Sequence, residues 1–468
     1  MSEEKKQLFQ QIFELLEARD QQALSALLAE QRSSDIAEVV ELLDNDQKRI
    51  IFDALEEEIA AEVLEKVDQA TRGALFEILA TGELTTLITH LDPDDAADVL
   101  SELEDEEERA MVLESINPEE ASQIRNLMSY SEDSAGGIMD PVVINVPESA
   151  TVSEAVSKIR AAEIDEDFYS VYVVDKFGKF LGDVRIRLLL TSPEQTKISS
   201  LVDEDTIYVT ADADQEEVLN IFSKNDLIVM PVLNKRHKLI GRITADRIIE
   251  VAEEEAAEDM YAMAGTDADE LEDVSVLHAA RVRMTWLLPC LIGTAVTAVV
   301  LMLFHRKFDF ENLAVIYTAA VAFVPMIAAI SGNAGLQTSA IVVCGLATGH
   351  LAAQKLNQVF MREVRVALLV AICCGVIGGF VCAFLPQMLG NSAYSGHADF
   401  AGHFRIVLAF GIGMFSAIMV ATTLGLFLPF LFRRIGIDPA ISSGPLVTTA
   451  NDSISVAIYM TLTLLLVA

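Results

Sequence analysis

One carboxylate, Asp452, stands alone near the middle of an apolar stretch that covers residues 439–467. A stretch of this length exceeds the roughly 20 residues needed to cross the hydrocarbon core of a membrane. Ionising an acid at that depth costs at least about 2.5 kcal/mol unless water, protein dipoles or a cation offset the cost. Because the stretch contains no Lys, Arg or His, we expect Asp452 to bind a cation. A buried structural acid, protonated or hydrogen-bonded, is the alternative.

The residues around Asp452 offer oxygen ligands. Hydroxyl and amide groups come from Thr448, Thr449 and Asn451, and the Gly444–Pro445 step breaks the helix so that carbonyls are exposed. Oxygen ligands without Cys or His suit a hard ion rather than zinc or copper. Mg²⁺ gives up its water reluctantly, so a site with one carboxylate favours the hydrated ion. One Asp from each of two subunits matches a divalent charge, which favours a homodimer with the pore on its axis.

A second segment, residues 325–339, also brings unusual residues to membrane depth. It contains a proline, two glycines and two amide side chains. Irregular backbone and polar groups are tolerated there only inside protein or beside water, although small residues also serve helix packing. We expect both segments to line the pore, through Asn333, Gln337, Gly444, Pro445 and Asn451.

Five membrane helices are predicted by long apolar runs at residues 284–304, 313–346, 364–389, 404–432 and 439–467. Basic residues favour the cytoplasmic side and so assign the orientation. On one side lie Arg281, Arg283, Lys355, Arg362, Arg365, Arg433 and Arg434, and on the other Arg306, Lys307 and Arg405. We therefore expect a multi-pass protein of the cell (inner) membrane whose N-terminal half is cytoplasmic and whose C-terminus lies outside.

The first 283 residues have a different composition. Of the 71 acidic residues 65 precede Met284, against 25 of the 33 basic ones, which gives this half a charge of −40. Such an excess repels phosphates, so it excludes nucleic acid as a partner, and it favours cations. Simple solubility also explains an acidic surface. All five cysteines lie in the second half, so the acidic half has no disulfide framework and no Cys-based metal site.

Residues 1–130 are predicted to be helical throughout, because apolar residues recur at spacings of three and four. The segment Asp35–Leu43 resembles Asp95–Leu103, and Ile59–Leu64 is a shorter echo between them. Helical hairpins that repeat in this way stack as a small α-solenoid, because no single pair buries its own apolar face. We expect an all-α superhelical domain that serves for docking.

Residues 131–250 show the order strand, helix, strand, strand and helix twice, over about 60 residues each time. The predicted strands are 142–146, 171–174, 180–184, 207–210, 228–233 and 239–244. This order resembles the cystathionine β-synthase (CBS) module, an α/β regulatory fold, with one copy at 131–200 and another at 201–250.

Many CBS modules end in a Gly-x-x-Thr/Ser-x-x-Asp motif that holds the ribose of an adenine nucleotide. The second copy keeps Gly241 and Thr244 but has Arg247 in place of the Asp. ATP is therefore an open alternative ligand here rather than the expected one. An acidic helix over residues 248–265 follows and connects the pair to the membrane segments. It either transmits movement or is a solvated linker.

Two long motifs and the domain order resemble the MgtE family of magnesium channels and transporters. The motifs run from Pro325 to Thr348 and from Asp438 to Asp452. The resemblance implies a helical N domain (1–130), two CBS modules, a connecting plug helix (251–280) and five transmembrane helices (281–468). It also implies a homodimeric, Mg²⁺-selective channel in the lipid bilayer that closes when cytosolic Mg²⁺ is high.

The resemblance also assigns residues to metal sites. In the pore, Asp452 would hold hydrated Mg²⁺ with carbonyls near Thr448, and Asp438 would form a further site. Regulatory ions would lie between acidic faces of the N domain, the second CBS module and the plug region. The residues at those faces are Glu62, Asp94, Asp98, Asp214, Glu216, Asp226, Glu250, Glu255, Glu258 and Asp259. Two departures are Arg247, where the family often has an acid, and Gly444, where an Asn can occur.

Three other functions compete with a Mg²⁺ channel. A coupled exchanger of Mg²⁺ or Co²⁺ has the same residues, and a membrane-anchored CBS sensor transports nothing. An enzyme is excluded because the acidic half contains no nucleophile–base pair, P-loop or His cluster.

Overall fold

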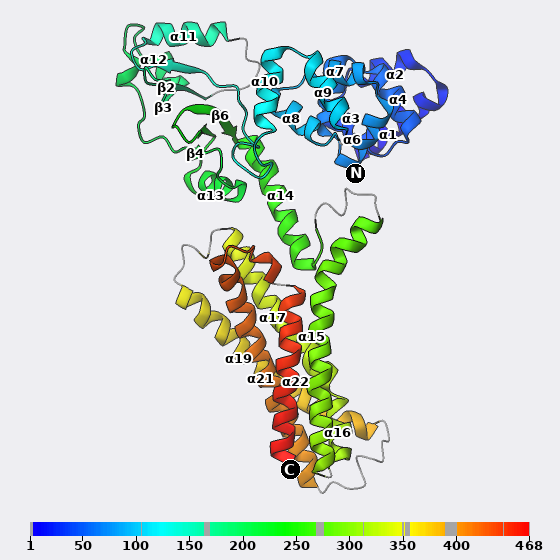
Figure 1. Cartoon of the computed structure of the whole chain (residues 1–468). Helices are drawn as coiled ribbons and strands as arrows, with labels where there is room; N and C mark the ends of the chain where they lie inside the picture. The colour runs from blue at the N-terminus through cyan, green and yellow to red at the C-terminus, as the bar shows by residue number, and fades with distance from the viewer. Residues whose placement is uncertain are drawn as a thin grey trace. The chain divides into compact units, whose positions relative to one another are not determined.

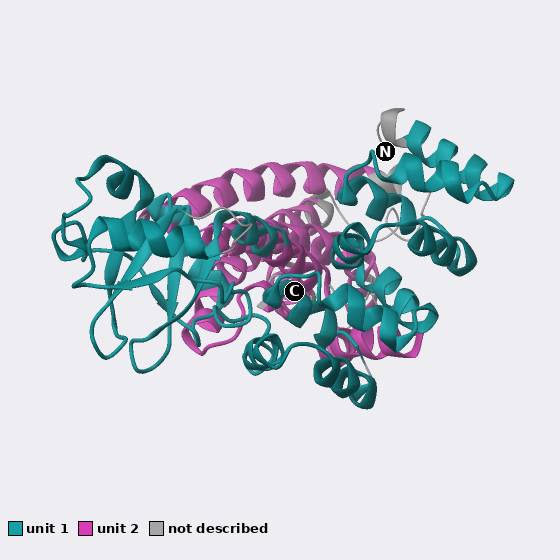
Figure 2. Cartoon of the chain, turned by 90° about the horizontal axis from the view of Figure 1, so that it is seen from above, with its two compact units in different colours: residues 1–253 teal, residues 254–468 magenta. Residues whose placement is uncertain are grey.

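A computed structural model describes residues 3–103, 105–162, 169–267, 276–311, 313–348, 351, 356–388, 400–442 and 444–467. The chain divides into two compact units, Met1–Glu253 and Glu254–Ala468, which Figure 2 shows in different colours. Over these ranges the architecture confirms the predicted fold class, with a helical N-terminal domain, two small α/β modules and five helices long enough to cross a membrane.

The described residues of the N-terminal domain form ten short helices (Figure 1). They are α1 (Glu3–Ala18), α2 (Gln21–Leu28), α3 (Ser33–Val40), α4 (Asn45–Ala54), α5 (Glu57–Lys66), α6 (Gln69–Ile78), α7 (Thr81–Ile88), α8 (Pro93–Ser101), α9 (Glu106–Ser115) and α10 (Pro118–Leu127). Side chains of Asp20, Asp44, Asp68, Asp105 and Asn117 cap the following helices by accepting backbone N–H groups. The three sequence repeats fall on α3, α5 and α8, and α5 packs against both of the others.

Each CBS module contains one three-stranded sheet. In the first, β1 (Asn145–Pro147) pairs parallel with β2 (Ser170–Val174), which pairs antiparallel with β3 (Phe180–Arg185). In the second, β4 (Val209–Thr210), β5 (Val229–Leu233) and β6 (Leu239–Thr244) repeat this order. The helical segments are α11 (Val152–Ala161), α12 (Ile186–Thr191), η1 (Ile198–Ser200), α13 (Gln215–Asn225) and α14 (Ala245–Ala264).

The strand predicted over 142–146 was too long. The Asp140 carboxylate accepts the Val142 N–H at 2.6 Å and so turns the backbone before the strand begins. The second module shares one hydrophobic core with the N-terminal domain, whereas the first has a core of its own. The N-terminal domain and the second module therefore fold against each other.

The second unit contains the membrane helices α15 (Val276–Phe310), α17 (Val324–Ala347), α19 (Leu356–Met388), α21 (Phe400–Arg434) and α22 (Pro445–Val467). The short α16 (Ala314–Val321) precedes α17, and the 3₁₀ turn η3 (Ala440–Ser442) precedes α22. The five predicted spans are confirmed. The connecting helix is α14, which begins within the second CBS module and ends at Ala264, so it is shorter than the predicted 251–280 segment; residues 268–275 lie outside the described part of the chain.

Close helix crossings explain the glycines of the membrane unit better than broken backbone does. We expected 325–339 to be irregular, but α17 is continuous there and the break lies before Val324. A methyl group on Gly425 of α21 would overlap the carbonyl oxygen of Gly335 on α17. On α15, a methyl group on Gly293 would likewise overlap Thr449 of α22. Glycine at these crossings lets the backbones approach closely.

Candidate functional site

Asp452 lies on α22 opposite a glycine of α17. Its Oδ1 atom would be 3.9 Å from a Cβ atom placed on Gly332, and the Thr448 methyl group would be 3.6 Å from the same point. Thr448 and Asp452 are four residues apart and so share one face of the helix. Asp452 is only partly buried. The Asp452 carboxylate and the Thr448 methyl group therefore face Gly332, while the Thr448 hydroxyl donates to the Gly444 carbonyl at 3.5 Å.

A buried network of hydrogen bonds fixes the residue before Asp452. Asn451 is fully buried, and its Nδ2 donates to Ser331 Oγ of α17 at 2.8 Å. Its Oδ1 accepts from Ser455 Oγ at 2.8 Å, while Ser331 Oγ donates to the Ile327 carbonyl at 2.7 Å. We expected Asn451 to line the pore. Its position between α17 and α22 instead gives it a structural contact with α17.

A second contact fixes the residue after Asp452. The Ser453 hydroxyl lies 2.8 Å from the Thr297 hydroxyl of α15 and donates to the Gly293 carbonyl at 3.3 Å. Successive helical residues point about 100° apart. With residue 451 held against α17 and residue 453 against α15, the rotation of α22 is set from both sides. The direction of the Asp452 side chain follows from these two contacts.

The two predicted amide residues of α17 point outward. Asn333 and Gln337 are exposed, lie four residues apart, and follow directly after Gly332 on the same helix. Exposed amide groups at membrane depth face water or another protein surface, because lipid offers them no partner. The polar surface beside Asp452 thus continues onto the outside of this chain.

The segment before α22 packs against the end of the connecting helix. A Cβ atom on Gly444 would lie 2.6 Å from the Met263 carbonyl oxygen of α14, and Ala262 and Met263 pack with Val343 and Ala440. Pro445 is the first residue of α22, where its missing N–H is tolerated.

The other predicted pore acid, Asp438, is exposed and accepts the Ala440 N–H at 2.8 Å. Asp452 lies about 10 Å along α22 from Pro445, since each helical residue rises about 1.5 Å. The structure therefore places the two acids at separate levels.

The predicted acids of the N-terminal domain lie on adjacent helices. Glu62 is exposed on α5, and Asp94 and Asp98 are partly buried on α8. The structure brings Asp98 together with Glu250 of α14, through a residue that lies between them: Arg247 Nη2 is 2.8 Å from Asp98 Oδ2, and Arg247 Nη1 is 3.0 Å from Glu250 Oε2. Burial raises the pKa of Asp98, whereas Arg247 lowers it.

The predicted acids of the second CBS module do not form one cluster. Asp214 caps the start of α13 by accepting the Glu216 N–H at 2.9 Å, and both residues are exposed. Asp226 ends the same helix in a left-handed conformation with φ 49°. Eleven helical residues separate the two ends by roughly 16 Å. Glu255, Glu258 and Asp259 follow on α14, where they are exposed or partly buried.

Within the described ranges, no three His, Cys, Asp or Glu side chains come close enough to hold one metal ion. The described part of this single chain therefore offers individual carboxylates for a cation rather than a closed cage of acidic ligands. A hydrated divalent ion fits such a site, because its water supplies most of the ligands.

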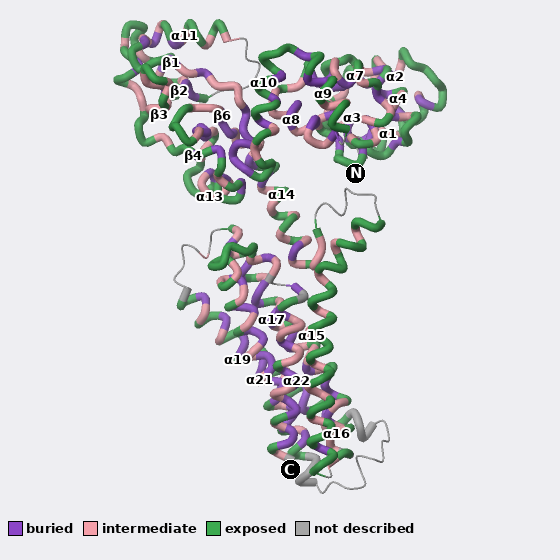
Figure 3. Tube along the Cα trace, viewed as in Figure 1, coloured by how far each residue is buried: buried purple, intermediate pink, exposed green. Residues whose placement is uncertain are grey.

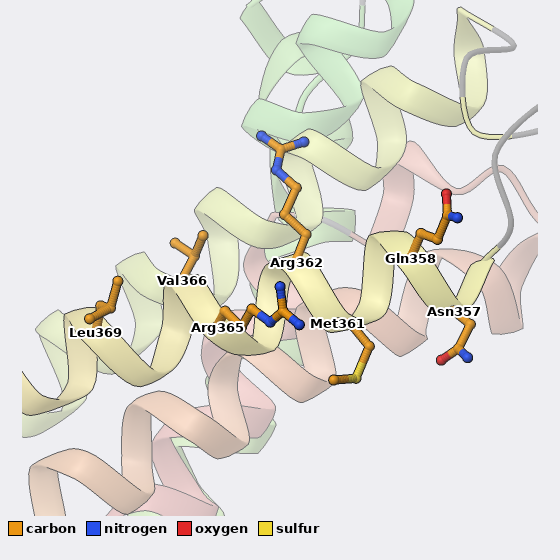
Figure 4. A pocket seen from close by; sticks show the side chains of 7 residues that line it. All are labelled: Asn357, Gln358, Met361, Arg362, Arg365, Val366 and Leu369. Carbon is orange, nitrogen blue, oxygen red and sulfur yellow. The ribbon is translucent and has the colours of Figure 1, made fainter.

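A groove of about 470 Å³ lies elsewhere, along the start of α19 (Figure 4). Its polar side chains are Asn357, Gln358, Arg362 and Arg365, and Met361, Val366 and Leu369 complete it. Two guanidinium groups repel a cation, so this groove is not the cation site.

Sequence reasoning missed the hydroxyl groups that orient α22, namely Thr297, Ser331, Ser453 and Ser455. Each is an ordinary membrane-helix residue by itself, since hydroxyl groups commonly satisfy their own helix backbone. Only the spatial arrangement shows that they join three helices around one carboxylate.

Three family models match the chain. The MgtE divalent cation transporter model matches residues 324–462, the MgtE intracellular N domain matches residues 31–133, and the CBS domain matches residues 135–192 and 198–254. These matches follow the domain order predicted from the sequence.

Curated relatives agree with the family models. The magnesium transporter MgtE of Thermus thermophilus is 29% identical over 460 residues, which cover 97% of each chain. That of Enterococcus faecalis is 30% identical over 342 residues, 73% of this chain and 71% of the relative. A crystal structure of the cytosolic domain of the Mg²⁺ channel MgtE in complex with ATP is 29% identical and covers 51% of this chain and 98% of that one, with a TM-score of 0.49.

These relatives confirm the expectation of a magnesium transporter rather than an enzyme. A helical N domain, a CBS pair and membrane helices occur in one chain, and a family model matches each of these regions. The chain therefore belongs to the MgtE family of divalent cation transporters.

Proposed function

We propose that two copies of this chain form a Mg²⁺ channel whose pore passes Asp452. The observation that carries the proposal is the fixed direction of Asp452, between contacts to α17 and α15, beside the exposed amides Asn333 and Gln337. A polar face that points out of one chain at membrane depth calls for water or a second polar face. A pore between two copies supplies both.

The exposure of α15 supports a dimer as well. No residue in its most apolar 18-residue window is buried by the described part of the chain, and Figure 3 shows exposed and intermediate residues along the helix. Lipid covers such a surface in a monomer, and a second subunit covers part of it in a dimer. One Asp452 from each copy then faces a divalent ion with two negative charges.

The ion passes in hydrated form. Asp452 attracts it by charge, while the Thr448 hydroxyl and nearby carbonyls accept hydrogen bonds from its water. Gly444, Pro445 and Asn451 shape the path around these groups, with Asn451 acting from within the protein. Asp438 forms a second, more exposed position for the ion.

Cytosolic Mg²⁺ closes the channel by neutralising acidic faces. We assign these faces to acids of three regions. They are Glu62, Asp94 and Asp98 of the N domain, Asp214, Glu216 and Asp226 of the second CBS module, and Glu250, Glu255, Glu258 and Asp259 of α14. The net charge of −40 on the first 283 residues supports the idea, because like charges oppose closure until cations bind. Burial, followed by the neighbouring acids Glu65, Asp92 and Asp98, raises the pKa of Asp95 to about 7.

The connecting helix transmits closure to the pore. Its last turn packs against Gly444 and Ala440, directly before the pore helix α22. Movement of this turn therefore acts on the segment that leads to Asp452. The N-terminal half is cytoplasmic, the C-terminus lies outside, and the protein resides in the inner membrane. ATP as a further ligand of the CBS pair is left to a binding measurement.

Mg²⁺ uptake by proteoliposomes tests the proposal. We expect Asp452→Asn to reduce uptake roughly five- to tenfold, because a hydrogen bond to a charged group typically contributes about 1.5–3 kcal/mol, against about 0.5–1.5 kcal/mol for a neutral one. Asp309→Asn, an exposed acid at the end of α15, is the matched control and should leave uptake unchanged. Full uptake by Asp452→Asn contradicts the channel and favours a sensor that transports nothing. Uptake that requires an opposing cation gradient indicates a coupled exchanger.

A further inference from the structure

Arg247 joins the N-terminal domain to the second CBS module. It lies in the first turn of α14, with 27% of its side chain exposed. One arm of its guanidinium group is 2.8 Å from Asp98 of α8, and the other is 3.0 Å from Glu250 on its own helix. One cation therefore bonds two carboxylates that belong to different domains of the same unit.

The surroundings of this contact are strongly acidic. Asp95 lies one turn before Asp98 on α8, and burial raises its pKa, followed by the charges of Glu65, Asp92 and Asp98. Arg247 acts in the opposite direction on both Asp95 and Asp98. Without a cation at this place, the carboxylates of α8 and α14 repel each other across the interface.

Another arginine that acts on α8, Arg72, serves the N-terminal domain itself, although it also lowers the pKa of Asp98. Arg72 bonds to Glu102 and donates to the carbonyls of Leu64, Glu65 and Val67 at the end of α5. It is thus occupied in joining α6 to α5 and α8. Arg247 by contrast reaches α8 from the CBS side, where the two domains share a continuous hydrophobic core.

We propose that Arg247 is a built-in cation that holds the N-terminal domain on the second CBS module without a divalent ion. An acid at this position would add a third carboxylate to Asp98 and Glu250 and make the contact depend on a bound cation. Arginine removes that dependence, because its planar fork bonds two carboxylates and keeps its charge at any physiological pH. The contact itself does not require the proposed channel function; its consequence for gating rests on that function.

For gating, we expect some acidic faces to stay closed without Mg²⁺ while others close only when Mg²⁺ binds. The edge formed by α8 and the start of α14 stays closed at low Mg²⁺. Asp98 and Glu250 are then bonded to Arg247 and leave the set of acids proposed above to close by binding Mg²⁺. Ion-dependent movement is confined to other acidic faces, such as those of Glu255 and Asp259 further along α14. An N-terminal domain held in this way moves together with the second CBS module.

Hydrogen exchange of the full-length protein in detergent tests the inference. In the wild type, we expect amides of α8 and of the first turns of α14 to exchange equally slowly with EDTA and with millimolar Mg²⁺. Arg247→Ala should speed their exchange at least about tenfold in EDTA, as for loss of a charged hydrogen-bond partner. In Arg247→Asp the same amides should exchange fast in EDTA and regain protection as Mg²⁺ is added, because the substitution creates a cluster of three acids that a cation can bind.

Matched variants separate this role from general damage. Arg236→Ala removes an exposed arginine from the β5–β6 turn and should change nothing in α8. Arg247→Lys keeps the charge without the fork and should give intermediate protection. Slow exchange of α1–α4 in every variant shows that the domain is folded. The inference is overturned if wild-type α8 needs Mg²⁺ for protection, or if Arg247→Ala leaves its exchange unchanged.

Asp452→Asn distinguishes this inference from the proposed channel. It should reduce uptake as stated above and leave the exchange of α8 unaltered. If the uptake test contradicts the proposed channel, hydrogen exchange alone still tests the role of Arg247.

Discussion

The network around Asn451 offers a prediction whose size follows from the structure. Asn451 makes two side-chain hydrogen bonds, one to Ser331 of α17 and one from Ser455 of its own helix. Hydrogen bonds between membrane helices contribute about 0.6 kcal/mol on average and about 1.7 kcal/mol at most. Asn451→Leu, which keeps a similar volume, should therefore lower the stability of the membrane unit by about 1–3 kcal/mol.

The effect on transport should exceed the effect on folding. Without the bond to Ser331, α22 loses the contact that sets the direction of Asp452 next to it. We expect the variant to purify as a folded protein, to take up Mg²⁺ several-fold more slowly, and to discriminate less between Mg²⁺ and Ca²⁺. The selectivity ratio is the decisive readout, because a purely structural residue changes the amount of active protein but not the ratio.

A double-mutant cycle with Ser331→Ala isolates the contact. If the two side chains act through each other, the double variant should resemble the single ones, with a coupling free energy of about 0.5–3 kcal/mol. Thr461→Ala is the matched control, since Thr461 is exposed on the same helix and, among the described residues, bonds its own Ala457 carbonyl. Additive losses, or an unchanged selectivity ratio in Asn451→Leu, would refute the reasoning.

Three further predictions concern packing, closure and acid stability. Gly425→Ala should force α21 away from α17 and lower the melting temperature of the protein. Gly82→Ala, at a position with open space around it, should leave the melting temperature unchanged. A Gly425→Ala variant that melts at the wild-type temperature contradicts the close crossing. Gly444→Ala should displace the end of α14, so that uptake falls less when Mg²⁺ is raised on the cytosolic side. Arg49 holds the pKa of Glu83 down to about 2, so their pair stabilises the N-terminal domain at neutral pH and is lost as the pH falls from about 4 towards 2. Thermal unfolding of Glu83→Gln should accordingly depend less on pH in that range.

Sequence reasoning was most successful where a pattern repeats along the chain. The five spans and the tandem βαββα modules follow from residue spacing alone, and the structure has them at nearly the predicted bounds. The prediction of an irregular segment at 325–339 was wrong, because glycines that permit a close crossing look the same in a sequence as glycines that break a helix.

Site residues divide in the same way. Asp452 could be identified from the free-energy cost of ionising a carboxylate in an apolar stretch, because this cost can be recognised without knowing which residues are its neighbours. Asn451, Ser331 and Thr297 could not be assigned their contacts, since these depend on which helices are neighbours. Arg247 was recognised as a departure, but its bond to Asp98 joins residues 149 positions apart and becomes visible only in three dimensions.

The central claim is that Mg²⁺ itself crosses the membrane past Asp452 and closes its own path from the cytosolic side. Patch recording of the purified protein, with Mg²⁺ varied on the cytosolic face, tests both parts at once. The account predicts a reversal potential that follows the Mg²⁺ gradient and a current that falls beyond the loss of driving force as cytosolic Mg²⁺ rises. A reversal potential that ignores Mg²⁺ contradicts the conduction pathway, and a current indifferent to cytosolic Mg²⁺ contradicts the gating.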